Sequence, residues 1–294
     1  MKQKVRCPWC QGTKTQRRGD YPKTRYHCQN PKCPHPWFYL EDAKVPLITV
    51  LDIETLPIHA RTWNIGKTRL SMDNIIKDWC LLGYSYKTLF SAEVKGEVLN
   101  PKEAVAHNDE RLARNLWNIL DRSDIVISHN GLSFDLPKIN ARLIKYGLPP
   151  PTPYRQIDTL QAARAGFNFT SNKLDYLGEY LGFGRKIHTT YQLWIDCDNG
   201  NKDALQEMLT YNLRDVTLLE DVYTVLRPWI PTHPNLSLYV NDDSANRKCR
   251  TCLSDNIDWG EEYVTNASVF DAYVCNNCGT HGRKDKRKRT TKIR

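Results

Sequence analysis

Long hydrophobic runs are missing from this chain of 294 residues. No apolar stretch approaches the roughly 20 residues that a helix needs to span a bilayer, so we expect no membrane partner. The basic first residues lead into no apolar segment either, which argues against a signal peptide. With 26% charged and 40% hydrophobic residues, the composition is typical of a soluble folded protein and excludes a disordered chain.

Negative charge is scarce at the two ends of the chain. The whole sequence carries 42 basic and 33 acidic residues, a net charge of +9. Residues 1–44 have 10 basic and 3 acidic side chains, and residues 283–294 have 8 and 1, whereas residues 45–282 have a net charge of −5. Cationic ends on a near-neutral body favour a polyanionic partner, most simply nucleic acid.

Ten cysteines need an explanation other than disulfides, because the chain shows no secretion signal. Eight of them form four short pairs, and two short pairs about 15–25 residues apart bring four thiolates around one zinc ion. The two expected zinc sites, one near each end of the chain, comprise Cys7, Cys10, Cys28 and Cys33, and Cys249, Cys252, Cys275 and Cys278. His27 or His35 can replace a cysteine in the first site, where the second pair is unusually wide.

The sequence therefore predicts a zinc ribbon at each end, at residues 1–44 and 244–282, each with one structural zinc ion. Three prolines between positions 228 and 234 indicate a linker over 229–243. The last twelve residues, 283–294, form a basic low-complexity run that we expect to be a flexible tail. The second ribbon is itself acidic, so we expect it to face a protein partner rather than DNA.

The first ribbon resembles the small zinc ribbons of transposase-like and phage proteins. The matching features are Cys7-Pro-Trp-Cys10, Arg17-Arg18-Gly19, Arg25-Tyr26-His27-Cys28 and Trp37-Phe38. Its basic and aromatic residues suit phosphate contact and base stacking, so Arg17, Arg18 and Arg25 are expected to bind nucleic acid. The aromatic residues can also supply the core of a very small domain, and both roles are compatible. The resemblance implies a phage or prokaryotic protein in the cytoplasm of a bacterial or phage-infected cell.

Residues 45–228 have the pattern of an α/β domain. Apolar, β-favouring runs predict strands at 47–52, 79–87, 88–94, 125–128 and up to 157. Helical spacing of apolar residues predicts helices at 109–120, 135–146, 172–181 and 202–226. Leading strands followed by alternating helices and strands favour an α/β fold.

Four acidic residues stand out by their position in these elements. Asp52 and Glu54 end a strand two residues apart, so both side chains point to the same side. Asp135 lies at the junction between a strand and a helix. Asp215 follows Tyr211 by four residues in the last helix, so the two share a face. Because hard oxygen ligands bind Mg²⁺ or Mn²⁺ well, the pattern predicts a metal site.

In order and context these residues resemble the DEDD superfamily of 3′–5′ exonucleases, in its tyrosine-containing branch. The three motifs are residues 50–55, residues 130–137 followed by Arg142, and residues 211–216. The resemblance covers residues 45–228. This region is similar to the proofreading exonuclease domains of family B DNA polymerases. It implies an RNase H-like fold, a mixed β-sheet flanked by helices.

The resemblance also implies a mechanism. The expected reaction is hydrolysis of the terminal phosphodiester at a 3′ end of DNA, which releases nucleoside 5′-monophosphates with the help of two Mg²⁺ or Mn²⁺ ions. Asp52 would bridge both ions, Glu54 and Asp215 would complete the site of the attacking water, and Asp135 would support the second ion. Tyr211 would orient the water, because a tyrosine with a pKa near 10 is a poor base at neutral pH.

Asn130, Phe134 and Arg142 are expected to contact the last nucleotides of the strand. Lys173, Arg185 and Lys186 either line its path or form a solvated helix end. The expected partners are single-stranded 3′ ends of DNA and a DNA polymerase or other replication protein, in replication or repair. Because only 66 residues follow position 228, we expect a stand-alone nuclease or an accessory subunit.

Two alternatives remain open at this point. The same site can serve an exoribonuclease or a structure-specific nuclease, because no residue visibly tests for a 2′-hydroxyl. The chain can also be a non-catalytic nucleic-acid-binding adaptor, although the complete set of motif acids argues against that.

Overall fold

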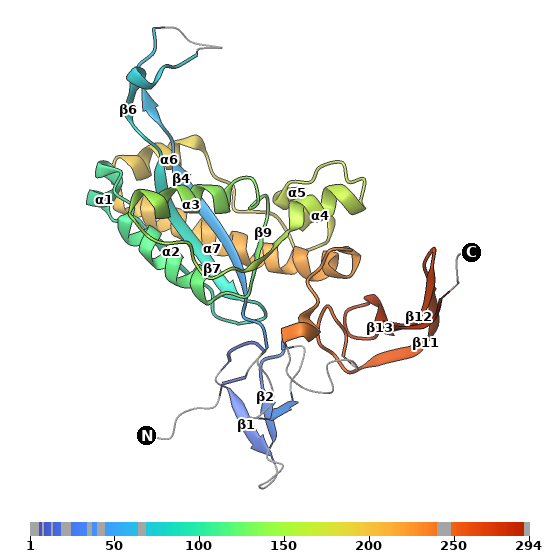
Figure 1. Cartoon of the computed structure of the whole chain (residues 1–294). Helices are drawn as coiled ribbons and strands as arrows, with labels where there is room; N and C mark the ends of the chain where they lie inside the picture. Colours follow the sequence, from blue (N-terminus) through green and yellow to red (C-terminus); the bar gives the residue numbers. More distant parts are fainter. Residues whose placement is uncertain are drawn as a thin grey trace.

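The computed structural model describes residues 6–7, 9–12, 14–18, 25–33, 37–39, 45–63, 69–239 and 248–290. A central α/β domain is joined at each end of the chain to a small three-stranded sheet (Figure 1). Each small sheet carries one of the two groups of four cysteines. In the described ranges, no helix combines the length and the apolar character that crossing a bilayer requires.

The central domain is built on a five-stranded mixed sheet with the strand order β10-β9-β4-β7-β8. Its strands are β4 (Ile48–Leu56), β7 (Cys80–Thr88), β8 (Lys95–Val98), β9 (Ile125–Ser128) and β10 (Arg155–Asp158). β4 pairs antiparallel with β7 and parallel with β9, so it lies in the middle of the sheet. A central strand is covered on both faces, which explains the continuous apolar run that precedes Asp52.

Helices cover both faces of the sheet and bury residues of β4 from both sides. They are α1 (Pro101–Ala106), α2 (Glu110–Arg122), α3 (Asp135–Lys145), α4 (Thr159–Gly166), α5 (Leu174–Tyr180), α6 (Tyr191–Asp198) and α7 (Lys202–Leu226). Leu51 and Ile53 pack in one cluster with the apolar faces of α2 and α3, whereas Val50 packs in another with α4, α5 and the second half of α7. Asp52 and Glu54 share the side of β4 that Val50 faces, because strand side chains alternate.

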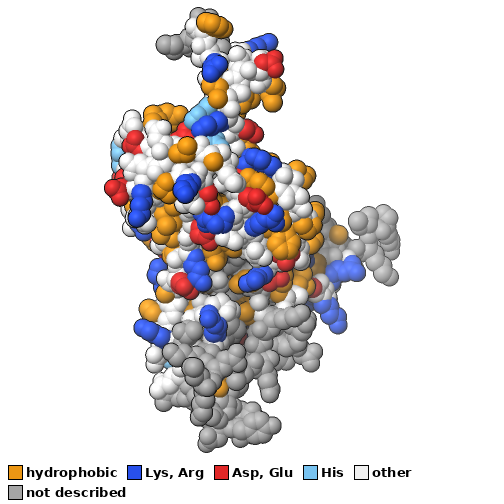
Figure 2. Space-filling model, turned by 90° about the vertical axis from the view of Figure 1, so that its left-hand side faces the viewer, with side chains coloured by type: hydrophobic (Ala, Val, Ile, Leu, Met, Phe, Trp, Pro, Cys, Tyr) orange, Lys and Arg blue, Asp and Glu red, His pale blue; other side chains and the backbone are white. Residues whose placement is uncertain are grey.

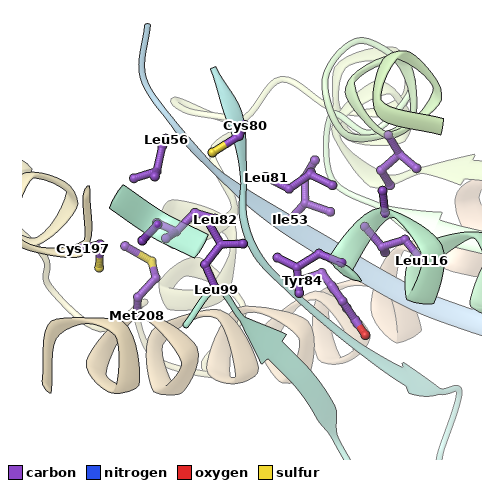
Figure 3. Packing of buried hydrophobic residues seen from close by; sticks show 14 of the residues in the cluster. Ile53, Leu56, Cys80, Leu81, Leu82, Tyr84, Leu99, Leu116, Cys197 and Met208 are labelled. Carbon is purple, nitrogen blue, oxygen red and sulfur yellow. The ribbon is translucent and has the colours of Figure 1, made fainter. Parts of the chain in front are cut away.

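The first half of α7 extends into the other cluster. Figure 3 shows part of this core, from Cys197 and Met208 through Leu82 to Leu116. α7 therefore packs along β8, β7 and β4 (Figure 1). Its middle, around Asp215, lies close to the end of β4. The fold class predicted from the sequence, a mixed sheet flanked by helices, is confirmed.

A hairpin that the sequence pattern did not indicate projects from the domain between β4 and β7 (Figures 1 and 2). Its strands are β5 (His59–Ala60) and β6 (Ile75–Lys77), which follows the 3₁₀ turn η1 (Met72–Asn74). Trp63 and Met72 on this hairpin are 98% and 80% exposed. Its base is held by the Lys77 ammonium, which donates to the carbonyl of Val105 at 2.8 Å.

The prediction of a strand at residues 88–94 is wrong. The chain turns there instead, and the third strand, β8, begins at Lys95. Phe90 has a φ of +64°, which no strand residue adopts, and its N–H donates to the buried carboxylate of Glu220 at 2.5 Å. Glu220 also pairs with the buried Lys87, so a contact from the last helix overrides the β-favouring local sequence.

The predicted flexible tail at 283–294 is corrected in the same way for residues 283–290, and residues 291–294 lie outside the described part of the structure. The second small sheet consists of β11 (Ile257–Val264), β12 (Ser268–Cys275) and β13 (His281–Thr290), so residues 283–290 form its third strand. β13 pairs antiparallel with β12, and its cations face acids on the sheet. Lys284 pairs with Asp271, and Lys288 and Arg289 pair with Glu262. Composition suggested disorder, but these cross-strand ion pairs order the segment.

The first small sheet consists of β1 (Thr15–Arg18), β2 (Arg25–Cys28) and β3 (Trp37–Tyr39), all antiparallel. Both terminal sheets dock on the same part of the central domain. Trp9 and Leu253 join the cluster that contains Leu89 and Leu236. The Asn30 side-chain amide donates to the carbonyl of Phe90 at 2.8 Å. The expected linker at 229–243 takes part in this contact, because η3 (Leu236–Tyr239) buries Leu236.

Candidate active site and zinc centres

Three carboxylates meet where the end of β4 faces the middle of α7. Asp52, Glu54 and Asp215 each offer an oxygen, and the three oxygens lie within 4.8 Å of one another. The side-chain amide of Asn212, one turn before Asp215, donates to Oδ2 of Asp52 at 2.6 Å. This contact fixes the orientation of Asp52 and explains why α7 presents two polar residues to the sheet.

Asp135 lies beside this cluster as the first residue of α3. It is buried, and its Oδ1 accepts the N–H of Ile53 at 3.1 Å, which ties it to the residue between Asp52 and Glu54. The preceding loop passes very close to β9, since a side chain at Gly131 would meet the Ser128 hydroxyl at 1.9 Å. Glycine is therefore required where the chain turns into α3.

Asp158, at the end of β10, holds the same loop from the other side. It accepts the backbone N–H groups of Asn130 and Leu132 at 3.0 and 3.1 Å, and it also caps α4. Asp158 is therefore a cap at the end of β10 and the start of α4. Its role is to position the loop that leads to Asp135.

The carboxyl groups of the cluster are buried and close together, so their ionised forms are disfavoured. Burial, then the charges of Asp135 and Glu54, raise the pKa of Asp52 well above its usual range. Burial raises the pKa of Glu54 to about 8 and that of Asp135 to about 7. Burial also raises the pKa of Asp215. Converging carboxylates with raised pKa values mark a site that gains free energy when it binds a cation.

Lys186 is the site residue to which sequence reasoning gave no firm role. Its ammonium donates to Oδ2 of Asp215 at 2.6 Å and lies 3.4 Å from the hydroxyl of Tyr211. Burial lowers the pKa of Lys186, but the charges of Asp215 and Asp52 raise it by more, so the net shift is upward. Lys186 is therefore a fixed cation of the site. Its position in the loop between α5 and α6 gave no signal beyond a short basic pair.

Tyr211 lies one helical turn before Asp215, with its ring edge against Trp194 at 6.3 Å between centroids. Burial and the charge of Asp215 raise the pKa of Tyr211 above its ordinary value. The hydroxyl is therefore protonated at neutral pH, and it can donate a hydrogen bond but cannot act as a base.

The donor set fits a hard divalent cation. Oδ1 of Asp215 is buried and has no hydrogen-bond partner among the described residues, although its other oxygen meets Lys186. A buried carboxylate oxygen without a partner is costly unless a cation satisfies it. Together with Asp52 and Glu54 it forms an all-oxygen group, the chemistry that Mg²⁺ and Mn²⁺ prefer.

A cleft of about 600 Å³ leads to this site from the side of α4 and α5. Its lining includes Asn130, Arg164, Lys173 and Lys186, so three cations border it. Of the three cations expected to line a path to the site, Lys173 and Lys186 border this cleft, whereas Arg185 is outside its lining and pairs with Glu179. Phe134 lies at the start of α3 and is 37% exposed, which leaves its ring open to stacking.

Arg142 is not available for nucleic acid, and its predicted contact is wrong. The side chain is buried and makes a 2.5 Å ion pair with Asp109, the residue before α2. It also donates to the carbonyl of Trp79 at 3.2 Å. Arg142 therefore joins α3 to α2 and β7. Arg17, Arg18 and Arg25 lie on β1 and β2, and their side chains are outside the described part of the structure.

The eight paired cysteines form two compact groups without disulfides. Closest sulfur separations are 3.5 Å for Cys10–Cys28 and 3.6 Å for Cys7–Cys33 and, at the other end, for both Cys249–Cys278 and Cys252–Cys275. Four sulfurs around zinc at about 2.3 Å stand roughly 3.8 Å apart, so both groups fit a zinc ribbon. His27 is not in the first group, which is complete with Cys33, and His35 is outside the described residues.

The chain is similar to one family of known proteins and to solved structures. Residues 85–227 match the family model of the RNase_H superfamily, a range that includes Asp135, Tyr211 and Asp215 but begins after β4. No curated protein matches the chain. Among solved structures, the family B DNA polymerase of the hyperthermophilic archaeon Pyrobaculum calidifontis is similar, with 14% identity and a TM-score of 0.43 over 66% of this chain. The chain spans 27% of that polymerase.

Proposed function

We propose that this RNase H-like domain is a metal-dependent 3′–5′ exonuclease that removes nucleotides from the 3′ end of DNA. The observation that carries the proposal is the convergence of Asp52, Glu54 and Asp215 within 4.8 Å, with one buried oxygen of Asp215 that has no hydrogen-bond partner among the described residues. The superfamily match supports nuclease activity in general. Beyond this general activity, we propose the 3′–5′ polarity, the preference for DNA and the two-ion mechanism.

The residues of the site have separate tasks. Asp52, Glu54 and Asp215 would hold the divalent ions, and Asp135 would support them from the start of α3. Bound divalent ions supply an activated water and offset the charge on the phosphate. The protonated hydroxyl of Tyr211 orients that water by hydrogen bonding. The ammonium of Lys186, held by Asp215, faces the entering phosphate and adds a fixed positive charge.

The substrate strand would reach the site through the cationic cleft. Asn130 lines this cleft. Phe134, at the start of α3, is partly exposed, so its ring is free to stack on the terminal base. Basic and acidic side chains are interspersed on the face of the central domain that Figure 2 shows. We therefore expect this cleft and the terminal sheets to bind the substrate strand.

The second terminal sheet offers such a surface, although residues 244–282 are themselves acidic. β13 adds cations to a groove of about 690 Å³ that also holds two aromatic rings. Its lining includes Lys248, Arg250, Trp259, Tyr273, Lys284 and Lys286. Basic and aromatic side chains together suit a single strand of nucleic acid. We propose that this groove extends the path of the substrate, in a protein that acts alone or beside a DNA polymerase.

A time course on strands labelled at either end tests the proposal. In Mg²⁺ or Mn²⁺, a 5′-labelled single strand of DNA should shorten progressively, while a 3′-labelled strand should release a labelled mononucleotide at once. Matched RNA strands test the alternative of an exoribonuclease, which faster loss of RNA would establish. Binding without hydrolysis in any divalent metal would overturn the proposal in favour of an adaptor.

A further inference from the structure

A second cluster of ligand-type side chains lies outside the carboxylate site, at the base of the projecting hairpin. His59 begins β5, His107 is the cap residue that follows α1, and Asp198 ends α6. Each offers one ligand atom, and these atoms lie within 4.8 Å of one another. The three residues are far apart in the sequence and have no ligand spacing, so only the fold brings them together (Figure 1).

The hydrogen bonds of His107 decide which of its nitrogens carries a proton. Nδ1 lies 2.7 Å from the backbone carbonyl of Asp78, and a carbonyl can only accept, so Nδ1 is the donor. A neutral His107 then has a bare lone pair on Nε2. That nitrogen faces Oδ1 of Asp198 at 2.7 Å, and Nε2 of His59 faces the other oxygen, Oδ2. Asp198 therefore has an imidazole nitrogen at each carboxylate oxygen.

We propose that His59, His107 and Asp198 bind a divalent transition-metal ion, best matched by Zn²⁺. One cation between the three groups satisfies the lone pairs of both rings and the carboxylate at once. Two imidazoles and a carboxylate suit Zn²⁺, unlike the all-oxygen group of the catalytic cluster. The Nδ1–H···O=C bond of His107 is the orienting contact that histidine ligands of metals usually make.

The backbone at His107 supports a functional demand for this side chain. Its φ of +50° is a left-handed conformation, which glycine or asparagine adopts at lower cost at the end of a helix. His107 nevertheless occupies the position and is 8% exposed. The conformation aims its ring at Asp198, so a strained backbone is retained where the imidazole is needed.

The ion would fix the hairpin to the central domain. His59 belongs to the hairpin, whereas His107 and Asp198 belong to helices of the domain, and the rings of the two histidines lie 5.0 Å apart. The side chain of His59 is one-third exposed, so water can reach the remaining coordination position. The expected role is a clamp at the hairpin base, next to the Lys77–Val105 contact.

Calorimetric titration with Zn²⁺ tests the site in the full chain, with the cysteine groups already loaded. The background variant is Asp52→Asn with Glu54→Gln, in which the catalytic cluster no longer competes. We expect one further equivalent of Zn²⁺, with affinity reduced at least tenfold by Asp198→Asn and unchanged by His188→Gln, an exposed histidine outside the cluster. No further equivalent in the background variant, or unchanged affinity in Asp198→Asn, would overturn the site.

Amide exchange provides a readout that does not depend on stoichiometry. Zn²⁺ should slow exchange in residues 75–79 of the background variant and leave it unchanged when His59→Gln is added. Because His59 is partly exposed, that variant is expected to fold even if a change at His107 is not tolerated. Equal slowing with and without His59→Gln would contradict the clamp.

Discussion

The ammonium of Lys186 lies 2.6 Å from Oδ2 of Asp215 and so places a fixed cation inside the carboxylate cluster. Lys186 comes from the loop between α5 and α6, whereas Asp215 lies in the middle of α7. The backbone N–H of Lys186 donates to Asp175 at 2.9 Å, which anchors the loop on α5. The site therefore combines one permanent positive charge with acids whose remaining charge needs added cations.

Removing this ammonium should destabilise the metal-free protein. For Lys186→Met we expect a loss of about 1–3 kcal/mol in the free energy of unfolding, below the value for a fully buried pair because Lys186 is partly exposed. Mg²⁺ should recover most of the loss by replacing the missing cation. Urea unfolding with and without Mg²⁺ measures both effects. Arg185→Met, at an exposed ion pair next to it, should change stability much less.

The raised pKa of Glu54 predicts how stability depends on pH. Its pKa is about 8 in the folded protein and about 4.5 ordinarily, so the folded state binds the proton more tightly. The contribution of Glu54 is fully present below about pH 4.5 and is lost as the pH rises through 8. Glu54→Gln, which carries no charge, should therefore become more stable relative to the wild type across this range in metal-free protein.

Two buried histidines make the difference between the variants the correct quantity to measure. Burial lowers the pKa of His129 and of His233 to about 4, so their contributions to stability rise with pH up to about 6.5 and oppose that of Glu54. Subtracting the wild-type curve removes them. A difference that stays flat from pH 4.5 to 8 would mean that Glu54 does not titrate as expected.

The cysteine groups predict two tightly bound zinc ions per chain. After a mild chelator has removed ions held by oxygen and nitrogen ligands, elemental analysis should find two zinc ions in the wild type and one in Cys252→Ser. The second ribbon should then unfold, because binding of structural zinc supplies much of the folding free energy of such small domains. Cys197→Ser, at a buried cysteine outside both groups, should keep two ions.

The groove beside β13 predicts a difference between two lysines of equal charge. Lys286 lines the groove, whereas Lys288 is outside its lining and is already paired with Glu262 and Asp271. Lys286→Ala should weaken binding of single-stranded DNA and reduce the salt dependence by about 0.7 for one lost phosphate contact. Lys288→Ala should have a smaller effect. Fluorescence anisotropy over a range of salt concentrations measures both, and equal losses would argue for unspecific attraction.

The sequence was most informative where local pattern and tertiary role coincide. The apolar run before Asp52 and the helical spacing around Asp215 predicted β4 and α7, and period-two geometry predicted that Asp52 and Glu54 share a face. Prediction from the sequence failed where contact with a residue distant in the sequence determines the local structure or the role of a side chain. Arg142 was expected to bind nucleic acid, but Asp109 buries it, and residues 283–290 were expected to be flexible, but acids on β11 and β12 order them.

The same limit applies to residues whose role the sequence left open or did not indicate. Lys186 acquires its role through contact with α7, and His59, His107 and Asp198 acquire theirs through the packing of three separate segments. No spacing rule links such residues. In both cases the site is identified by where a charge or a lone pair lies in the folded structure, rather than by a sequence motif.

The most direct test of the account is the exonuclease activity of Asp52→Asn on labelled single-stranded DNA in Mg²⁺. Loss of a metal ligand should remove several kcal/mol of transition-state stabilisation, so we expect a decrease of roughly 10³-fold or more. Zinc content and unfolding should remain close to the wild type. Glu207→Gln, at an exposed acid on the same helix as Asp215, should keep full activity. Activity of Asp52→Asn within about threefold of the wild type would contradict the assignment of the carboxylate cluster as the catalytic centre.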